Sequence, residues 1–253
     1  MSLPYGRDAI DAVVLGVEDV LVPLRTPSAW QWAWRPQGPL LGERRVHAAM
    51  RRTLRAWDRR RWRGLTGVET PADAGALEAH LKAALFALAG HPLPADEADA
   101  VVRRLMHPAG APERFADVEP ALRRLDAAGV TVGAVTGLPE ESARWLLGRA
   151  ALGTVPLMLP GDSPAGLPER AAYRAIASSI EVPIARIAFV GGLFWSDVRA
   201  AARAGAAALL LDRFDVWPKV GHGRILKLEA LERALQSGGS PSPPAEPPGA
   251  PQP

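Results

Sequence analysis

Short runs of consecutive apolar residues alternate along the chain with stretches in which apolar residues recur every three or four positions. The first run, at residues 13–17, is rich in β-branched residues and apolar on both faces, as strands of parallel sheets are. Similar runs occur later, at residues 130–135, 155–159, 187–190 and 206–211. The intervening stretches predict helices at residues 118–128, 139–147, 168–180, 197–204 and 228–235. This alternation predicts an α/β fold built on a doubly wound parallel sheet.

A long helical stretch interrupts this alternation after the first strand. Between residues 41 and 62, apolar side chains recur at helical spacing, at Val46, Met50, Leu54 and Trp57. A second helix is expected to begin at Thr70, with Pro71 in its first turn. A third is expected at residues 96–106.

The chain therefore divides into a core, an insertion and a tail. We expect residues 1–24 and 116–235 to form the α/β core, and residues 25–115 to form a helical cap inserted into it. Residues 236–253 contain only Gly, Ser, Pro, Ala, Glu and Gln. A segment of this composition cannot bury apolar surface, so we expect a disordered Pro-rich tail.

Composition excludes several kinds of chemistry. The chain has no cysteine, which excludes disulfides, thiolate zinc sites and cysteine nucleophiles. No apolar run approaches the roughly 20 residues of a membrane-spanning helix, and residues 1–11 lack the pattern of a signal peptide. We therefore expect a cytoplasmic protein with no membrane contact. The pI of about 9.8 reflects an excess of arginine at a net charge of only +3, which is weak evidence for a nucleic-acid partner.

Four short motifs occur in order along the predicted core. The first strand ends in GVED at residues 16–19, and a later strand ends in VTG at residues 135–137. The sequence LPERAAY at residues 167–173 leads into a helix, and GGLFWSD at residues 191–197 follows another strand. Sites in α/β proteins lie at the carboxyl ends of parallel strands, so these motifs are expected to meet at one edge of the sheet.

The order of these motifs resembles the haloacid dehalogenase (HAD) superfamily of phosphatases and dehalogenases, in the subclass with a helical cap inserted after the first strand. The resemblance covers residues 11–235. It implies an HAD-like Rossmannoid core, ancestry among hydrolases, and Mg²⁺ as the cofactor if the protein is active. We expect no cofactor if it is not.

The resemblance also assigns roles to the residues at the first two strand ends. In the family the first strand ends in Asp-x-Asp, whose first Asp is the covalent nucleophile and whose second is the acid/base. Gly16 stands at the nucleophile position and Glu18 at the acid/base position. Thr136 matches the residue that hydrogen-bonds the transferring phosphoryl group. Because a glycine has no carboxylate, a phosphoaspartyl intermediate cannot form at residue 16.

Two further positions lack the charged residue that the family carries. Leu167 stands at the position of a lysine that neutralises the nucleophile and the phosphate. Gly192 stands at the first of two metal-binding aspartates, and Asp197 matches the second with one extra residue between them. If Mg²⁺ is bound, only Glu18 and Asp197 remain as plausible side-chain ligands. The combined losses indicate a retired active site.

The remaining pocket is expected to be more apolar than that of an active member. Leu193, Phe194 and Trp195 fill a loop that is small and polar in active members. The pocket could be filled by its own side chains, or it could bind a less polar ligand. Candidate binding residues are Asp19, at a position where the family usually has glycine, Trp195 in this loop, and Arg170, one helical turn after Leu167.

The predicted cap is rich in arginine and tryptophan. Residues 44–63 contain nine arginines and a single acid, Asp58. Trp30, Trp32 and Trp34 alternate with other residues, which predicts an extended segment with one exposed face. An arginine-rich helix can present a solvated basic face, bind a protein or an acidic partner, or bind nucleic acid.

These observations leave three hypotheses for function. The favoured one is a HAD-like protein that has lost phosphohydrolase activity and acts by binding an unknown protein or small-molecule ligand. The second is an active phosphohydrolase with a rearranged acidic site, in which Glu18 or Asp19 acts with Asp197 and a water nucleophile. The third is a nucleic-acid-associated protein that uses the arginine-rich cap.

Overall fold

A computed structural model describes the chain at residues 3–5, 8–24, 26–34, 42–65, 94–106, 113–138, 140–159, 170–220 and 223–236. The helix predicted from Thr70, the lysine position at Leu167 and the tail beyond residue 236 lie outside the described residues.

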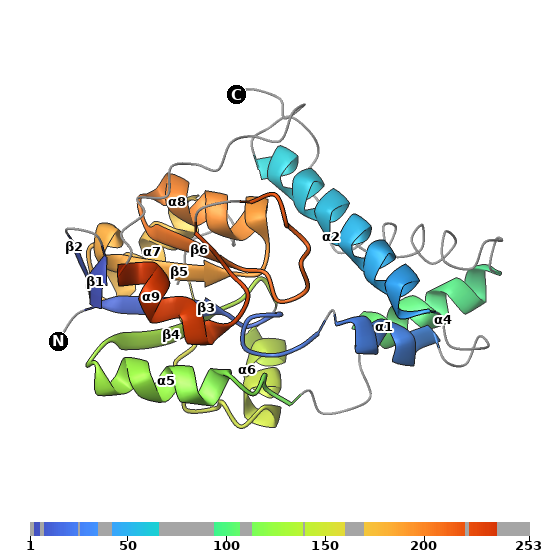
Figure 1. Cartoon of the computed structure of the whole chain (residues 1–253), viewed down its shortest axis with the longest axis horizontal. Coiled ribbons are helices and arrows are strands. Elements are labelled where there is room, and N and C mark those ends of the chain that lie inside the picture. The colour runs from blue at the N-terminus through green and yellow to red at the C-terminus, as the bar shows by residue number, and fades with distance from the viewer. Residues whose placement is uncertain are drawn as a thin grey trace.

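A five-stranded parallel sheet forms the centre of the molecule (Figure 1). Its strands lie in the order β4-β3-β5-β6-β7 and span β3 (Ala12–Gly16), β4 (Thr131–Val135), β5 (Ile187–Gly191), β6 (Ala207–Leu211) and β7 (Arg224–Ile225). This confirms the α/β fold class and the parallel sheet. A short antiparallel hairpin, β1 (Leu3–Tyr5) and β2 (Asp8–Ile10), precedes the sheet and was not anticipated.

Helices cover both faces of the sheet, as a doubly wound fold requires. In β3, Val13 and Leu15 join one buried cluster and Ala12 and Val14 join the other, because successive strand residues point to opposite faces. The first cluster contains residues of α5 (Val118–Ala127), α6 (Glu140–Arg149), η4 (Leu228–Ala230) and α9 (Leu231–Gln236). The second contains residues of α7 (Arg170–Ser179) and α8 (Ala200–Ala204), and η2 (Ile184–Arg186) leads into β5.

Three further helices lie beside the sheet in the range predicted for the cap: α1 (Pro27–Trp34), α2 (Glu43–Leu65) and α4 (Ala95–Met106) (Figure 1). The apolar stripe predicted for α2 is buried. Three of its members, Val46, Met50 and Leu54, belong to the same cluster as α7 and α8, so this helix packs directly on the core. Arg104 Nε donates to the carbonyl oxygen of Ala33 at 2.8 Å and ties α4 to α1. No helix in the described part of the chain is both long and apolar enough to span a membrane.

The alternating tryptophans lie in a helix, so the predicted extended segment is wrong. Thr26 caps the start of α1, because its Oγ1 accepts the N–H of Ala29 at 3.0 Å. Pro27 occupies the first helical position, where a missing N–H costs nothing. These two capping signals outweigh the period-two pattern of the aromatic residues.

Two other predicted elements differ in detail. Residues 155–159 do not form a strand; Leu157 makes one isolated bridge to Ala134. Pro156 has no N–H to extend the ladder, which explains why pairing stops there. The helix predicted from residue 197 begins earlier, as a π-helical segment, η3 (Phe194–Arg199), that continues into α8.

Candidate functional site

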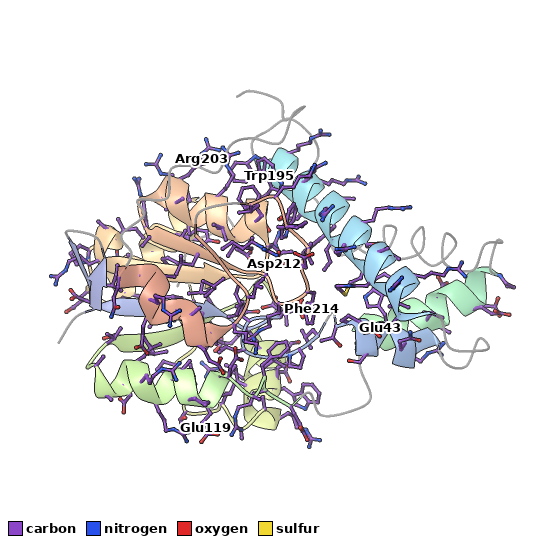
Figure 2. The ribbon with its side chains drawn as sticks, viewed as in Figure 1. Glu43, Glu119, Trp195, Arg203, Asp212 and Phe214 are labelled. Carbon is purple, nitrogen blue, oxygen red and sulfur yellow. The ribbon has the colours of Figure 1, made fainter. Side chains whose placement is uncertain are left out.

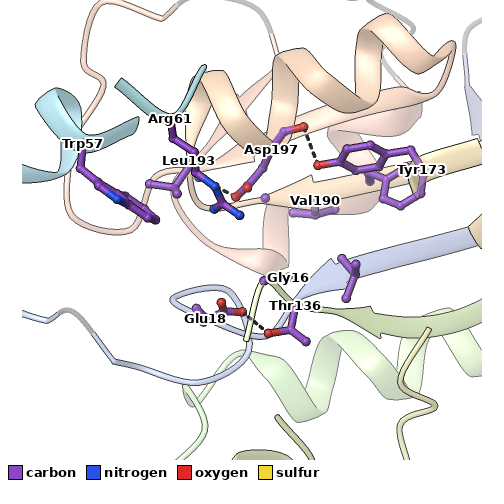
Figure 3. Close-up of a pocket in the computed structure, with 13 residues that line it drawn as sticks. Gly16, Glu18, Trp57, Arg61, Thr136, Tyr173, Val190, Leu193 and Asp197 are labelled. Atoms are coloured by element: carbon purple, nitrogen blue, oxygen red, sulfur yellow. Dashed lines mark hydrogen bonds between the residues drawn. The ribbon is translucent and has the colours of Figure 1, made fainter. Parts of the chain in front are cut away.

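A pocket of about 50 Å³ lies at the carboxyl ends of β3, β4 and β5 (Figure 3). Since β3 has β4 on one side and β5 on the other, the chain winds in opposite directions from this point, where α/β proteins bind ligands. The space suffices for roughly three to five waters at about 10–15 Å³ each. Its lining residues are Gly16, Glu18, Trp57, Arg61, Val135, Thr136, Gly137, Tyr173, Phe189, Val190, Gly191, Leu193 and Asp197.

Gly16, the last residue of β3, presents only backbone to this pocket. A Cβ atom at this position would lie 3.3 Å from Cγ2 of Val20 and 3.6 Å from the carbonyl oxygen of Val190. The first of these contacts is tighter than most side chains experience, so a larger residue requires Val20 to give way. The strand end therefore offers no side-chain nucleophile.

Glu18 and Thr136 are hydrogen-bonded to each other in the pocket (Figure 3). Thr136 Oγ1 donates to Oε2 of Glu18 at 2.9 Å and accepts the N–H of Leu138, also at 2.9 Å. A hydroxyl has a single proton, so while this bond persists Thr136 cannot donate to a bound anion.

Asp197 lines the pocket from η3. Its Oδ2 accepts the N–H of Leu193 at 2.9 Å, which closes the turn between β5 and the helix. A Cβ atom at Gly191 would lie 2.3 Å from Cβ of Asp197, so only glycine allows this close approach. The extra residue between Gly192 and Asp197 falls within the π-helical turn, a geometry that often occurs at functional sites.

Tyr173 closes the pocket on the side of α7. Its hydroxyl donates to the carbonyl oxygens of Ser196 and Asp197, each at 3.3 Å. Burial raises the pKa of Tyr173 well above its ordinary value of 10.0, with the carboxylates of Asp197 and Asp58 acting in the same direction and Arg61 against them. The phenol therefore stays protonated and serves as a donor.

The structure brings only part of the predicted site together. Glu18, Thr136 and Asp197 line the pocket, whereas the three candidate binding residues do not. Asp19 is buried in the turn after β3, where it has a φ of 59° and its Oδ1 accepts the N–H of Leu24 at 2.9 Å. Aspartate tolerates this left-handed conformation better than most residues, which explains how it stands at a position where the family usually has glycine.

The other two candidates lie away from the pocket lining. Trp195 is 3% exposed, and its ring packs against Phe194 at 5.0 Å and Trp62 at 6.1 Å between centroids. Arg170 is exposed at the first turn of α7. Trp195 thus helps to join the cap to the core.

Two cap residues that the sequence analysis did not assign to the site also line the pocket: Trp57 and Arg61 of α2. Figure 3 shows the guanidinium of Arg61 pointing into the pocket beside Asp197. Its Nη2 lies 3.1 Å from the position that a Cβ at Gly137 would occupy. A signal was present, because residue 61 continues the buried stripe of α2 at helical spacing after Trp57.

Asp58 fixes α2 to the core. Its carboxylate is fully buried and accepts the N–H groups of Trp195 and Ser196, both at 2.9 Å, and the hydroxyl of Ser196 at 2.7 Å. Burial raises the pKa of Asp58 despite these hydrogen bonds and the nearby charge of Arg61. The sequence offered one sign of this role, because Asp58 is the single acid among the nine arginines of residues 44–63.

Further contacts run along the same side of α2, on the side of the core where Trp195 and Phe214 lie (Figure 2). His47 Nε2 lies 2.6 Å from the carbonyl oxygen of Phe214, and Arg55 Nε donates to the carbonyl oxygen of Val216. Arg51 Nη1 pairs with Asp215 at 3.4 Å. The guanidinium carbon of Arg199 lies 5.5 Å from the centroid of the Trp62 ring and 4.8 Å from that of Trp195. These contacts hold Arg61 and Trp57 over the pocket.

The donor set does not fit a resident Mg²⁺. Among the described residues, no three acidic or histidine side chains are grouped so that they could hold a metal. Mg²⁺ requires near-octahedral oxygen coordination. Gly16 and Gly192 contribute no side-chain oxygen, and one oxygen each of Glu18 and Asp197 already accepts a hydrogen bond.

Comparison with known sequences identifies the family of this fold. The sequence profile of the haloacid dehalogenase-like hydrolase family matches residues 10–205. No curated protein matches the sequence at a significant level.

Solved structures share the fold at low sequence identity. YfnB of Bacillus subtilis, a HAD hydrolase bound to magnesium, has a TM-score of 0.63 and 16% identity, with 92% of this chain and 99% of that chain covered. The L-2-haloacid dehalogenase of Xanthobacter autotrophicus, with chloropropionic acid covalently bound, has a TM-score of 0.60 and 16% identity, with 90% and 98% covered. A HAD family hydrolase of Deinococcus radiodurans with bound phosphate and sodium has a TM-score of 0.60 and 19% identity, with 91% and 96% covered. At these identities the likeness establishes the fold alone.

Proposed function

We propose that this chain, which belongs to the haloacid dehalogenase-like hydrolase family, has lost the phosphohydrolase activity of that family and acts by binding a ligand or a partner in the cytoplasm. The observation that carries this proposal is Gly16. It lies at the end of β3 and lines the pocket, at the position from which the resemblance expects the nucleophilic carboxylate.

The hydrogen bonds of the remaining polar residues support the same proposal. The hydroxyl of Thr136 donates a hydrogen bond to Glu18, and Asp197 accepts a hydrogen bond from the backbone N–H of Leu193. Each group therefore has a structural task within the protein. A hydrolase needs such groups directed at the substrate, with at least one base within hydrogen-bond reach of the attacking water.

Two features favour binding. The pocket combines aromatic and apolar walls with a few polar groups, as small-molecule sites do, and its volume of about 50 Å³ restricts a ligand to one of a few heavy atoms. The cap also presents a basic surface for a partner, because five arginines of α2 are exposed: Arg44, Arg45, Arg52, Arg59 and Arg60. We propose an unknown protein or small molecule as the partner, and no membrane.

An active phosphohydrolase with a rearranged site is the second candidate. It is favoured by the presence of both Glu18 and Asp197 in one pocket. In such an enzyme Glu18 would take a proton from water, and the water oxygen would form a bond to phosphorus as the ester P–O bond breaks. Glu18 would then return the proton to the departing alkoxide, which leaves as the alcohol. Asp19 fits this role less well, since its carboxylate is buried in the turn and accepts the N–H of Leu24.

A nucleic-acid-associated protein is the third candidate, and the same exposed arginines of α2 favour it. Binding to DNA or RNA that falls steeply with salt concentration would support it, because phosphate contacts release condensed counterions.

Hydrolysis of a generic aryl phosphate tests the proposal directly. We expect that the wild type, with or without Mg²⁺, gives no turnover above that of a Glu18→Ala, Asp197→Ala double variant. Metal-dependent turnover that the double variant loses would contradict the proposal and support the second candidate. The double variant is the matched control, because it removes both acids of the pocket and leaves its backbone intact.

A further inference from the structure

Arg61 is the one cationic side chain among the described residues that line the pocket. The acidic members of that lining are Glu18 and Asp197. We propose that the guanidinium of Arg61, supplied by the cap, takes over the role of the divalent cation, so that the pocket holds its ligand without Mg²⁺. This inference rests on the proposed function, since it describes the cofactor requirement of the same site.

The position of Arg61 fits this role. Figure 3 shows its guanidinium beside Asp197 and on the opposite side of the pocket from Glu18 and Thr136. The guanidinium carbon lies 5.3 Å from the centroid of the Trp57 ring, one helical turn earlier on α2, and this contact orients the side chain. Gly137 leaves room for it, because a Cβ atom there would lie only 3.1 Å from Nη2.

The different chemistry of Mg²⁺ and a guanidinium explains why Arg61 can replace the metal ion in this pocket. Mg²⁺ needs oxygen ligands in a strict geometry, and neither Gly16, which ends β3, nor Gly192, which follows β5, supplies a side-chain oxygen. A guanidinium carries its charge permanently and directs five N–H donors, so it can neutralise carboxylates without a full coordination shell. The field of Arg61 reaches the surrounding groups, since it opposes the rise in the pKa of both Asp58 and Tyr173.

The cap holds this cation in place. Asp58, three residues before Arg61 on α2, is fully buried and hydrogen-bonded to Trp195 and Ser196 of η3. The same segment η3 carries Asp197. The residues that hold Asp58 and the acid that Arg61 faces therefore belong to one segment, which keeps the guanidinium at the pocket.

The test is the melting temperature of the full chain and of Arg61→Met, each measured with and without Mg²⁺. Arg60→Met is the matched control, because Arg60 is the neighbouring residue of α2 and is exposed. We expect no Mg²⁺-dependent shift for the wild type or for Arg60→Met. In Arg61→Met the acids of the pocket lose their cation, so the melting temperature should fall by roughly 2–4 °C. Mg²⁺ should not restore it, because the pocket lacks the oxygen ligands that this ion requires.

Two further variants define the origin of the effect. Adding Asp197→Asn to Arg61→Met should recover most of the loss in melting temperature, because it removes the charge that Arg61 faces. Arg61→Lys should lose less than Arg61→Met because it keeps the charge. Circular dichroism establishes that each variant is folded, and Arg61→Gln replaces Arg61→Met if the latter is not.

The inference is overturned if Mg²⁺ stabilises the wild type, or if Arg61→Met melts at the same temperature as Arg60→Met. These outcomes are independent of the aryl phosphate assay. Turnover by the wild type would contradict the proposed function, whereas Mg²⁺ binding by an inactive wild type would contradict only the role of Arg61.

Discussion

Two buried aspartates connect helices in different regions of the molecule, and they do so by different means. In the core, Asp117 accepts Nη1 of Arg213 at 2.9 Å and the N–H of Leu228 at 2.8 Å. Arg213 also donates to the carbonyl oxygen of Val20 at 2.9 Å. At the cap, the donors to Asp58 among the described residues are all neutral and come from the backbone and the side chain of η3.

The difference appears in how each carboxyl group ionises. Burial alone would raise the pKa of Asp117, but the hydrogen bond and charge of Arg213 outweigh it and hold the pKa below the ordinary value of 3.8. Burial dominates at Asp58 and raises its pKa above the same value. Ionisation therefore strengthens the junction in the core and weakens the contact of the cap.

The largest expected effect is at the core junction. Arg213→Met leaves the carboxylate of Asp117 buried without its cation, and the two side chains are only 7% and 8% exposed. Breaking one partner of a buried pair costs about 3–5 kcal/mol, which we expect as the loss in the free energy of unfolding measured in urea. Arg124→Met, in the exposed pair of Arg124 with Glu232, should cost less than about 1 kcal/mol. Equal losses for both variants would show that Asp117 does not depend on its cation.

A smaller loss is expected at the cap contact. Asp58→Ala leaves two N–H groups and one hydroxyl of η3 without their acceptor, which should lower the free energy of unfolding by about 2–4 kcal/mol. Tryptophan fluorescence should change as well, because Trp195 is one of the residues released. Asp126→Ala, at an exposed position of α5, is the control and should stay within about 0.5 kcal/mol of the wild type. A variant as stable as the wild type would mean that the cap does not depend on Asp58.

The smallest effect is a difference in pH dependence, and it has opposite signs at the two sites. Because the pKa of Asp58 is raised in the folded state, its contribution is complete below 3.8 and is lost as pH rises through the folded pKa. Because the pKa of Asp117 is lowered, its contribution is present above 3.8 and is lost as pH falls through the folded pKa. The loss in the free energy of unfolding of Asp58→Asn, relative to the wild type, should therefore shrink as pH rises. The corresponding loss of Asp117→Asn should grow.

Unfolding of these two variants and the wild type, followed at a series of pH values, checks this contrast. Slopes of the same sign for both variants would show that the two junctions do not differ in the way that the structure indicates.

Local patterns were sufficient for most of the core. The apolar runs at β3, β4, β5 and β6 were found because a strand buried on both faces leaves a short, unbroken apolar segment. Elements with weaker local signals were missed or misassigned. The hairpin of β1 and β2 has no apolar run. The alternating tryptophans of α1 imitate the pattern of a strand, whereas the start of this helix depends on the cap at Thr26.

The candidate site was predictable to a smaller extent. Glu18, Thr136 and Asp197 meet in one pocket because the carboxyl ends of neighbouring parallel strands converge. The predicted binding residues are near these strand ends in sequence, but their side chains lie elsewhere. Asp19 is bonded within a turn, Trp195 packs against the cap, and Arg170 is exposed at the surface. Adjacency in sequence did not reveal which way each side chain points.

The sequence by itself determined the order of the four motifs along the chain. It also determined the loss of carboxylates at Gly16 and Gly192, since an absent side chain is absent in any fold. Helical spacing also placed residue 61 in register with the buried stripe of α2. What that stripe faces was decided only by the tertiary structure. The contact of α2 with η3 through Asp58 places Arg61, of the nine arginines in residues 44–63, in the lining of the pocket. Contacts between segments so far apart in sequence produce no local sequence pattern.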